Sequence, residues 1–367
     1  MKKILLFTIV VAIAFAAPTA FGGGTELSAE AATLTKVLTS GQNVVQTAVP
    51  LVAGDGLGIW KALGLDVERI HYVSGPPQLE ANPSGDWDIG WIGATAANAG
   101  ILKYDMKVIF LSGYDYSNMA FVRDDSDIYL AGDQGVPGTW GTAEEWRGKD
   151  ILAPVGTVVY ADLMLTLKEL GLTGDDVNII NMDVSTALQA FLAGEGDVLF
   201  TCSAYASAIA KRDGYHIIHT MEGMGAGMSG TIIANRTYLA ENEDVVVKYL
   251  EGALEIIFWL GDEINVQQAA EWYVKVMKED FGVEMSLEDA ITNVKQIGFK
   301  DLTFYEDLCK VGDDGLTGLQ REFKKFFDYH VQIGAADSAN TEKIIAAVDC
   351  SYLAKTIENY KANHGLN

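Results

Sequence analysis

Seven short segments rich in glycine, serine and threonine stand at the ends of predicted strands. The unpaired backbone N–H groups of such segments carry positive partial charge and hold anionic or polar groups without a charged side chain. One loop of this kind is more often an ordinary turn or helix cap, but seven in one chain predict a binding cleft. The segments are SGQN from Ser40, SGPP from Ser74, GAT from Gly93, SGYDYSN from Ser112, PVGTV from Pro154, TCSAY from Thr201 and GMSGT from Gly227.

Aromatic and polar side chains in and beside these loops extend the prediction to single residues. A small-molecule site combines apolar or aromatic walls with a few polar groups that converge on the ligand. The predicted ligand-binding residues are Gln42, Asn43, Gln46, Ser74, Trp91, Gly93, Thr95, Tyr114, Asp115, Tyr116, Asn118, Thr157, Tyr160, Asp183, Ser203 and Tyr205.

The chain offers little for catalysis. His216 and His219 are the only histidines close in sequence, and on a predicted strand their side chains face opposite sides. The segment GMGAGMSGT lacks the Lys-Ser/Thr ending of a phosphate-binding loop, and GDGLG does not match the dinucleotide fingerprint. Cys202 and Ser203 have no base placed by sequence to activate them. We therefore expect no enzyme activity, no metal and no cofactor.

Strands and helices alternate through the first two thirds of the chain. Strands are expected at 35–38 and 67–73 and in WDIGWIG, KVIFLS and MAFVR, with helices between them and a polar loop, TSGQNVVQT, after the first strand. The acidic, glycine-rich stretch 124–146 has the composition of a surface excursion. This alternation indicates an α/β layered sheet.

A helical tail is expected after the sheet-forming part. From Glu243 to about Asn359 the chain reads as helix after helix, and Val246, Leu250 and Leu254 share one apolar stripe. We expect this tail to pack onto one of the lobes described next.

A long stretch of the sequence is echoed about a hundred residues later. KALGLDVERI at 61–70 resembles KELGLTGDDVNII at 168–180, and GDWDIGWIGATAANA at 85–99 resembles GEGDVLFTCSAYASA at 194–208. The spacing between the paired segments is nearly kept, which favours two similar lobes. The length of 367 residues also exceeds that of one compact domain.

The N-terminus has the pattern of a secretory signal. Lys2 and Lys3 precede a short apolar run at 4–17 that falls below the ~20 residues of a spanning helix. Cleavage is expected after Ala16 or after Ala31, the alternative being a retained membrane anchor. No cysteine lies near either site, so no lipid anchor is expected. The formal charge of −24 argues against nucleic acid and anionic membranes as partners.

The cysteines form an odd set of three. Cys309 and Cys350 are able to pair in an oxidising compartment, but the sequence does not decide between this and reduced, buried thiols.

These segments together resemble a known family. KALGLDVE, SGDWDIGWIGATAANAG, FVRDDSDI, the long segment WRGKDILAPVGTVVYADLMLTLKELGLTGDDVNIINM and ALQAFLAGEGDVLF are similar to the periplasmic solute-binding proteins of ABC importers in the nitrate, sulfonate and taurine group. The likeness covers roughly 34–260.

The resemblance implies a hinged, two-lobed periplasmic-binding-protein fold of type II, with a helical C-terminal tail. Residues 1–31 would be signal peptide and leader, 34–119 with 231–362 the first lobe, and 120–230 the second. The family traps its ligand between the lobes and delivers it to a membrane permease. We therefore expect a monomeric periplasmic protein with a small-molecule ligand and an ABC permease as partners.

The chain departs from the family in the charge of its loops. Members often hold their anions with an arginine or lysine beside helix N-termini, whereas none of the seven loops contains a basic residue. Asp115 and Asp183 are available instead, unless they cap helices or face water. The hypothesis that follows is a ligand with a cationic or neutral polar part, such as an amino-sulfonate or a nitrogenous aromatic compound.

Two other functions are compatible with the same fold. Cytoplasmic relatives of the family make a pyrimidine precursor or act on a menaquinone intermediate, but the signal pattern and the lack of a catalytic cluster argue against an enzyme. A binding protein that docks to a sensory receptor is the second alternative.

Overall fold

The computed structural model describes residues 34–225, 227–332, 334 and 336–366. The predicted signal peptide and leader at 1–31 lie outside these residues. Within the described ranges, no helix has the length and apolar character needed to cross a membrane.

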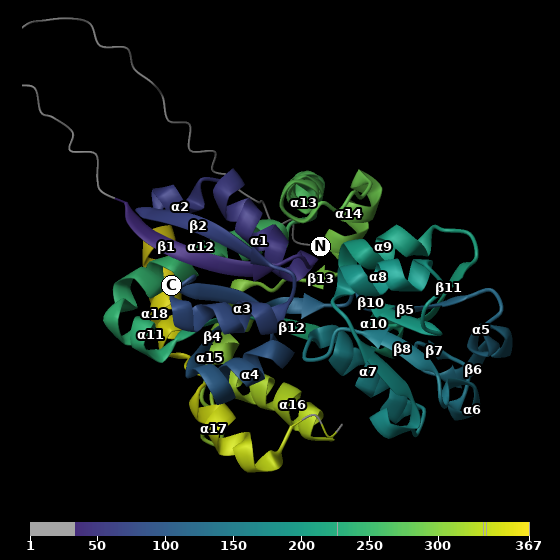
Figure 1. Cartoon of the computed structure of the whole chain (residues 1–367). Coiled ribbons are helices and arrows are strands. Elements are labelled where there is room, and N and C mark those ends of the chain that lie inside the picture. Colours follow the sequence, from purple (N-terminus) through teal and green to yellow (C-terminus); the bar gives the residue numbers. More distant parts are fainter. Residues whose placement is uncertain (1–33, 226, 333, 335, 367) are drawn as a thin grey trace, which may run out of the picture. The chain divides into compact units, whose positions relative to one another are not determined.

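The described strands form two sheets, each surrounded by helices (Figure 1). The first sheet has the strand order β13-β4-β12-β3-β1-β2. In it, β1 is parallel to β2 and β3, whereas β12 is antiparallel to β3 and β4. Its strands are β1 (Thr35–Gln42), β2 (Leu65–Tyr72), β3 (Ile89–Gly93), β4 (Met106–Asp115), β12 (Met228–Asn235) and β13 (Ile297–Gly298).

The second sheet has the order β6-β7-β11-β5-β10-β8-β9. Here β8 is parallel to β9 and β10, whereas β5 is antiparallel to β10 and β11. Its strands are β5 (Met119–Arg123), β6 (Asp133–Val136), β7 (Thr139–Trp140), β8 (Asp150–Ala153), β9 (Asn178–Asn181), β10 (Val198–Thr201) and β11 (Tyr215–Thr220).

The two sheets repeat one topology. The order β2-β1-β3-β12-β4 in the first corresponds to β9-β8-β10-β5-β11 in the second. The fourth strand in each of these orders, β12 or β5, is antiparallel to both of its neighbours. Along the chain, β5 comes directly after β4 of the first sheet, and β12 comes after β11 of the second sheet. Two chain crossings therefore connect the sheets.

The repeated K-x-L-G-L segments occupy equivalent places in this topology. The segment 61–65 leads from a short helix into β2, and 168–172 leads from a longer helix toward β9. Gly64 has φ +76° and Gly171 has φ +73°, a left-handed conformation that glycine adopts without a steric penalty. The repeated segment therefore ends a helix at the equivalent place in each half of the chain.

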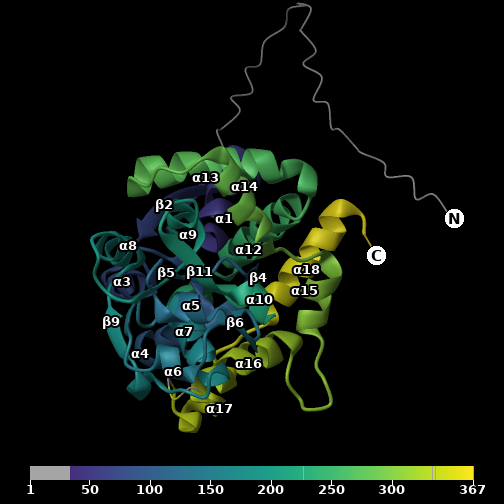
Figure 2. The same cartoon turned by 90° about the vertical axis from the view of Figure 1, so that its right-hand side faces the viewer.

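Helices follow the strands and then make up most of the C-terminal part (Figures 1 and 2). The α-helices are α1 (Val45–Gly56), α2 (Ile59–Ala62), α3 (Gly75–Ala81), α4 (Ala94–Tyr104), α5 (Asp127–Ala131), α6 (Ala143–Trp146), α7 (Val158–Glu169), α8 (Val184–Leu192), α9 (Ser203–Ala210), α10 (Met221–Met224), α11 (Arg236–Glu241), α12 (Glu243–Leu260), α13 (Val266–Phe281), α14 (Leu287–Lys295), α15 (Leu302–Cys309), α16 (Gly318–Gln332), α17 (Thr341–Ala346) and α18 (Ser351–His364). Short 3-10 helices lie at Asn82–Ser84, Gly174–Asp176, Glu263–Asn265 and Ser338–Asn340.

The tail helix α12 packs on the first sheet. The predicted stripe is confirmed, because Val246, Leu250 and Leu254 are fully buried, and each such side chain contributes about 1.5–3 kcal/mol by burial. The hydroxyl of Tyr249 on α12 accepts a hydrogen bond from Trp91 Nε1 at 2.7 Å. This polar contact fixes the helix to β3 inside an otherwise apolar layer.

Four polar segments that we expected to be loops or a surface excursion form strands. Residues 39–42 continue β1, where the Thr39 hydroxyl donates to the carbonyl of Ile89 at 3.1 Å. Residues 112–115 and 228–230 lie on β4 and β12 and pair with each other. Residues 133–140 form β6 and β7 at the edge of the second sheet. In β1, β4 and β12, ladder pairing with a distant segment overrides the local turn preference, whereas β6 and β7 pair with each other as a local hairpin.

The predicted lobe boundaries, 34–119 with 231–362 and 120–230, fall inside β5 and β12. The assignment of residues to lobes at these positions stays a prediction.

Candidate functional site

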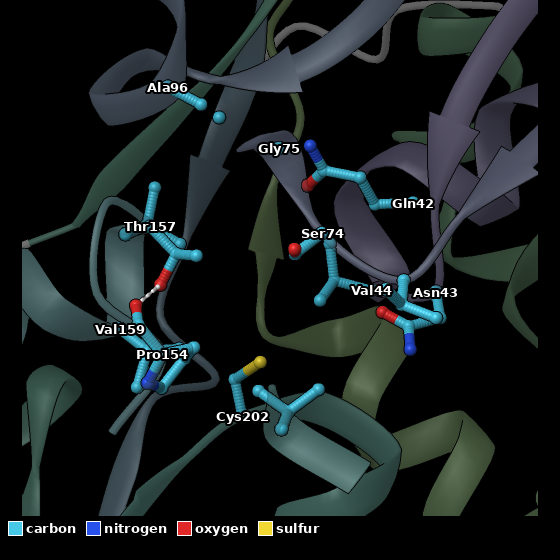
Figure 3. A pocket seen from close by; sticks show the side chains of 14 residues that line it. Gln42, Asn43, Val44, Ser74, Gly75, Ala96, Pro154, Thr157, Val159 and Cys202 are labelled. Carbon is cyan, nitrogen blue, oxygen red and sulfur yellow. Dashed lines mark hydrogen bonds between the residues drawn. The ribbon is translucent and has the colours of Figure 1, made fainter. Parts of the chain in front are cut away.

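A cavity lies at the edge of the two sheets where the parallel strands end. Its free space is about 420 Å³ when the open solvent at its mouth is included, and about 30 Å³ of this is available to the centre of a water-sized sphere (Figure 3). Parallel strands end on the same edge of a sheet, so the helices that follow them also begin there. The cavity is therefore bounded by the beginnings of six helices, which are α1, α3 and α4 from the first sheet and α7, α8 and α9 from the second.

The residues at these helix starts line the cavity. They are the N-cap residues Val44, Ser74, Gly93, Thr157 and Cys202 and the first residue of α8, Val184. A helix N-terminus carries about half a positive charge on its unpaired N–H groups. Six helix starts around one small space favour negative charge without any ionised side chain, although Pro76 and Pro77 have no N–H and reduce the contribution of α3.

Side-chain capping differs among these helices. The hydroxyl of Thr157 accepts from the backbone N–H of Tyr160 at 3.4 Å and caps α7. The carboxylate of Asp183 accepts from the N–H groups of Ser185 and Thr186 at 3.0 and 3.1 Å and caps α8. The other four helices, α1, α3, α4 and α9, have no side-chain cap.

The side chains around the cavity are neutral. Every described residue that lines it is uncharged, and Gln42, Asn43, Ser74 and Thr157 supply the polar groups. Most of the remaining surface is aliphatic, from valines with Ala96 and Pro154. The arrangement suits a small solute with a hydrogen-bond-accepting head and an apolar body.

Two contacts join the sides of the cavity. Asn43 Nδ2 donates to the Tyr205 hydroxyl at 2.7 Å, which connects the end of β1 to α9. The N–H of Val45, at the start of α1, donates to Ser203 Oγ at 3.3 Å. Ser203 has φ +48°, a left-handed conformation that costs a non-glycine residue about 1–2 kcal/mol. The backbone strain thus lies at one of these connections.

Several polar atoms around the cavity are buried without a hydrogen-bond partner among the described residues. They include Asn43 Oδ1 and both amide atoms of Gln46. Buried polar atoms in folded proteins are nearly always paired, so these atoms are available to a solute or to water.

Asp115 and Asp183 do not line the cavity. Asp115 is 2% exposed, and its carboxylate accepts from the Ser117 N–H at 2.7 Å. Burial raises the pKa of Asp115 to about 6. Burial also acts to raise the pKa of Asp183, but the hydrogen bonds from Ser185 and Thr186 outweigh it and leave that pKa below its usual value. Asp183 therefore caps a helix, which is one of the two alternatives that the sequence left open.

The structure divides the other predicted residues into three groups. Gln42, Asn43, Ser74, Gly93 and Thr157 line the cavity. A second group contacts residues of the lining. Tyr205 and Ser203 do so through the two hydrogen bonds described above, and Asn118 donates from Nδ2 to the Val158 carbonyl at 3.4 Å. Gln46 Nε2 lies 3.9 Å from the position that a Cβ would take on residue 93.

The third group lies elsewhere. Trp91 is buried in the first sheet against α12. The Tyr114 hydroxyl donates to Glu322 on α16 at 2.9 Å, and Tyr116 lies beside Gly227. Thr95 and Tyr160 line a separate cavity of about 1060 Å³.

Sequence reasoning missed the apolar part of the lining. Val44, Val73, Val158, Val159 and Val184 all line the cavity. The prediction named polar and aromatic residues and therefore omitted these valines, although each lies in or directly beside a predicted loop or helix start. Position next to a helix start was the available signal.

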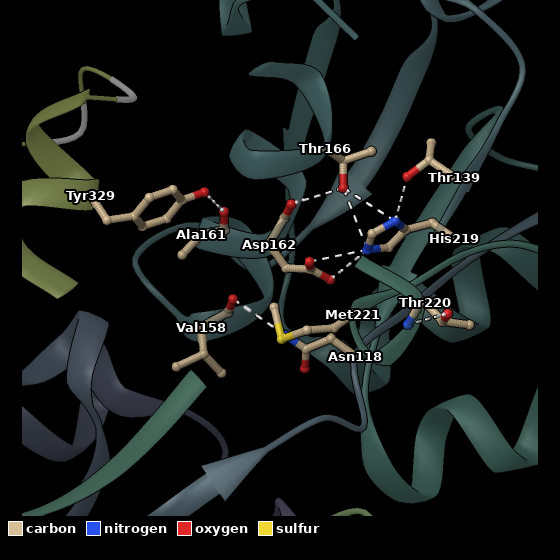
Figure 4. Close-up of polar contacts among 11 residues, drawn as sticks. Asn118, Thr139, Val158, Ala161, Asp162, Thr166, His219, Thr220, Met221 and Tyr329 are labelled. Atoms are coloured by element: carbon tan, nitrogen blue, oxygen red, sulfur yellow. Dashed lines mark hydrogen bonds and ion pairs between the residues drawn. The ribbon is translucent and has the colours of Figure 1, made fainter. Parts of the chain in front are cut away.

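A polar cluster elsewhere in the second sheet has the composition of a catalytic triad (Figure 4). His219 Nε2 lies 3.0 Å from Asp162 Oδ1, and His219 Nδ1 lies 2.9 Å from Thr139 Oγ1. All three residues are at most 1% exposed, and the cluster fixes α7 to β11 and β7. His216 instead meets Asp124 near the surface, which confirms the predicted opposite orientation of the two histidines.

Metal binding has no support in the described ranges. Among those residues, no group of three or more His, Cys, Asp or Glu side chains is placed to hold a metal ion.

Comparison with known proteins finds relatives among binding proteins. No protein-family model matches the chain. A protein of Brachyspira hyodysenteriae named as an ABC transporter periplasmic binding protein is 25% identical over 280 residues, 74% of this chain and 79% of that protein. The homologues of this chain are periplasmic binding proteins of ABC transporters. A Bacillus subtilis protein named for binding aliphatic sulfonates is 23% identical over 82% of this chain and 81% of its own.

Solved periplasmic binding proteins share the fold. The alkanesulfonate-binding protein SsuA from Xanthomonas axonopodis pv. citri, bound to MOPS, has a TM-score of 0.65 at 15% identity and covers 87% of this chain and 99% of its own. The nitrate-binding protein NrtA from Synechocystis PCC 6803 has a TM-score of 0.70 at 13% identity, with 89% of each chain covered. The mixed α/β periplasmic-binding-protein fold expected from the sequence is thereby confirmed.

Proposed function

We propose that this chain is the solute-binding component of an ABC importer, and that it captures a small aliphatic sulfonate between its two sheets and delivers it to a permease. One observation carries the proposal: six helix N-termini face a cavity whose described lining is entirely neutral.

The electrostatics favour an anionic head over an amine. Converging N–H groups stabilise negative charge and repel positive charge, and each helix end contributes roughly 0.3–1 kcal/mol at exposed sites and up to about 2 kcal/mol in partly buried ones. Asp115 and Asp183 lie outside the lining and do not offset this potential by direct contact. An amino-sulfonate or a nitrogenous aromatic compound, as expected from the sequence alone, is therefore a weaker candidate than a simple sulfonate.

The aliphatic walls favour a short apolar body on this head. Val44 directly before α1, Val73 directly after β2, and valines of α7 and α8 surround the polar helix starts. Burial of alkyl groups contributes about 0.8 kcal/mol per methylene. A longer alkyl chain is expected to bind more tightly until the cavity is full.

Export and delivery complete the proposal. The basic and apolar N-terminal pattern supports secretion through a cleaved signal peptide without a lipid anchor, and the single-chain cavity supports a monomer that docks to an inner-membrane permease.

The test is a thermal-shift panel of the purified mature protein with matched compounds. The panel contains alkanesulfonates of increasing length, the corresponding amino-sulfonates, the corresponding alkylamines, and nitrate. A ligand at a hundred times its dissociation constant stabilises the folded state by about 2.7 kcal/mol, a shift of several degrees. We expect the largest shift with an alkanesulfonate and none with alkylamines. A shift with amines and none with sulfonates would contradict the proposed ligand class.

A further inference from the structure

Two cysteines far from the cavity lie side by side. Cys309 is the last residue of α15, and Cys350 is the N-cap residue of α18. Their Sγ atoms are 2.9 Å apart, which is less than 1 Å longer than a disulfide bond. Cys350 is buried and Cys309 is partly exposed. Both are free thiols in this structure.

The surrounding backbone holds this pair together independently of the sulfur atoms. Residue 349 donates its N–H to the Val108 carbonyl on β4 at 2.8 Å, and its carboxylate pairs with Lys107 at 2.6 Å. Lys361 on α18 pairs with Glu306 on α15 at 3.0 Å. The two helices pack against each other, as Figure 2 also shows. Little movement is needed for the sulfur atoms to bond.

We infer that Cys309 and Cys350 form a structural disulfide in the exported protein. The inference rests on the proposed export, because disulfides form in oxidising compartments such as the periplasm and are rare in the cytosol. Cys202 is excluded as a partner by its place at the start of α9 in the cavity lining.

The reaction is thiol–disulfide exchange with a protein disulfide oxidant. The Cys309 thiolate attacks the oxidant's disulfide and forms a mixed disulfide, with release of one oxidant thiol. The Cys350 thiolate then attacks the Cys309 sulfur, and the oxidant leaves as a dithiol. The two cysteines lose two electrons and two protons in total, and the oxidant accepts them. Cys309 is the better attacking group because it is the more accessible, and its hydrogen bond with Cys350 lowers the pKa of Cys309.

The bond would constrain a segment that reaches the second sheet. The segment between the cysteines contains α16 and α17. On α16 the Tyr329 hydroxyl donates to the Ala161 carbonyl of α7 at 3.1 Å, and Gln332 accepts from Lys168 at 2.9 Å. The disulfide would thus fix both ends of the segment whose middle contacts α7, a helix that opens on the cavity.

The experiment counts free thiols in the full-length protein secreted to the periplasm. After unfolding without reductant, alkylation should modify Cys202 alone, and peptide mapping should find Cys309 and Cys350 joined, about 2 Da lighter than the two thiols. Reductant should lower the Tm by about 5 °C in the wild type and in Cys202→Ser, but not in Cys309→Ser/Cys350→Ser.

Protein made in the cytosol and treated with oxidised glutathione gives a test that does not depend on export. Pairing there and in the periplasm supports the inference. Three alkylated cysteines in both preparations overturn it. Ligand-induced thermal shifts are recorded on the same samples, so failure of the disulfide is distinguished from failure of the proposed function.

Discussion

The two sheets have the same topology but present their helix starts differently. The first sheet contributes α1, α3 and α4, none of which has a side-chain cap. In the second sheet, Thr157 caps α7 and Asp183 caps α8, and only α9 is without a cap. A cap uses N–H groups that a ligand would otherwise bind. Two of the uncapped starts are also occupied, because the N–H of Val45 on α1 donates to Ser203 Oγ and the N–H of Ser203 on α9 donates to Ser117 Oγ. The start of α3 contains Pro76 and Pro77, which have no N–H. The comparison therefore indicates that α4 offers a ligand the most available N–H groups.

The two aspartates show the same contrast in their ionisation. Asp115 ends β4 of the first sheet in a buried environment that raises its pKa to about 6. Asp183 of the second sheet is a capping residue whose pKa is lowered by Ser185 and Thr186 against the opposing effect of burial. Asp115 therefore stabilises the folded state more at low pH, whereas Asp183 stabilises it more at higher pH.

The largest effect is expected from filling the contact between Gly93 and α7. A Cβ on residue 93 would lie 2.7 Å from Val158 Cγ1, so Gly93→Ala should separate the two sides of the cavity. Overpacking of this kind costs about 1–3 kcal/mol, which corresponds to a loss of affinity of roughly 5–150-fold by calorimetric titration. The control is Gly93→Ala/Val158→Ala, in which the added methyl group is accommodated and affinity should recover. Unchanged affinity in Gly93→Ala would show that the contact between residue 93 and Val158 does not govern ligand binding.

The second prediction concerns stability against pH at Asp115. With a folded pKa of about 6 and an unfolded pKa of about 3.8, the folded state holds more proton between these values, so this residue lowers stability as pH rises. Its contribution falls by up to about 3 kcal/mol between pH 4 and pH 7.

Asp115→Asn should remove this contribution, measured as the difference in urea unfolding free energy between variant and wild type at pH 4.5 and pH 7. The variant is expected to gain stability relative to wild type at the higher pH. An equal difference at both pH values would show that Asp115 ionises normally.

A smaller effect is expected at the hydrogen bond that joins the two sides. Tyr205→Phe removes the acceptor for Asn43 Nδ2 and should weaken ligand binding by roughly 1 kcal/mol, about fivefold, with little change in the stability of the free protein. Tyr129→Phe, on α5 and outside the cavity lining, is the matched control. If both variants bind as the wild type does, the Asn43–Tyr205 contact does not contribute to ligand affinity.

The smallest effect is expected at the cap of α8. Asp183→Ala should cost about 1 kcal/mol of unfolding free energy, whereas Asp183→Asn should retain most of the cap, since asparagine is a comparable N-cap residue. Because the folded pKa is depressed, the charge-dependent part of the stabilisation is present above the unfolded pKa near 4 and is lost as pH falls through the folded value. Ligand affinity should be unchanged in both variants. A loss of affinity in Asp183→Asn would instead place this carboxylate at the ligand.

Much of the fold was predictable because its signals are local. Strand and helix patterns repeat at nearly fixed spacing, and Gly64 and Gly171 end equivalent helices in both halves. Five predicted loops therefore fell at helix starts around one cavity. Segments 112–115 and 228–230 were misread as loops because their strand pairing joins positions more than a hundred residues apart.

The sequence by itself determined the two α/β halves, the helical tail and the loops that begin helices, since each depends on residue types within a few positions of one another. Only the tertiary structure decided which aspartate caps a helix, that valines complete the lining, and that Asn43 meets Tyr205. It also placed Cys309 beside Cys350. The physical reason is that these features depend on how closely distant segments approach, which packing fixes and local sequence does not encode.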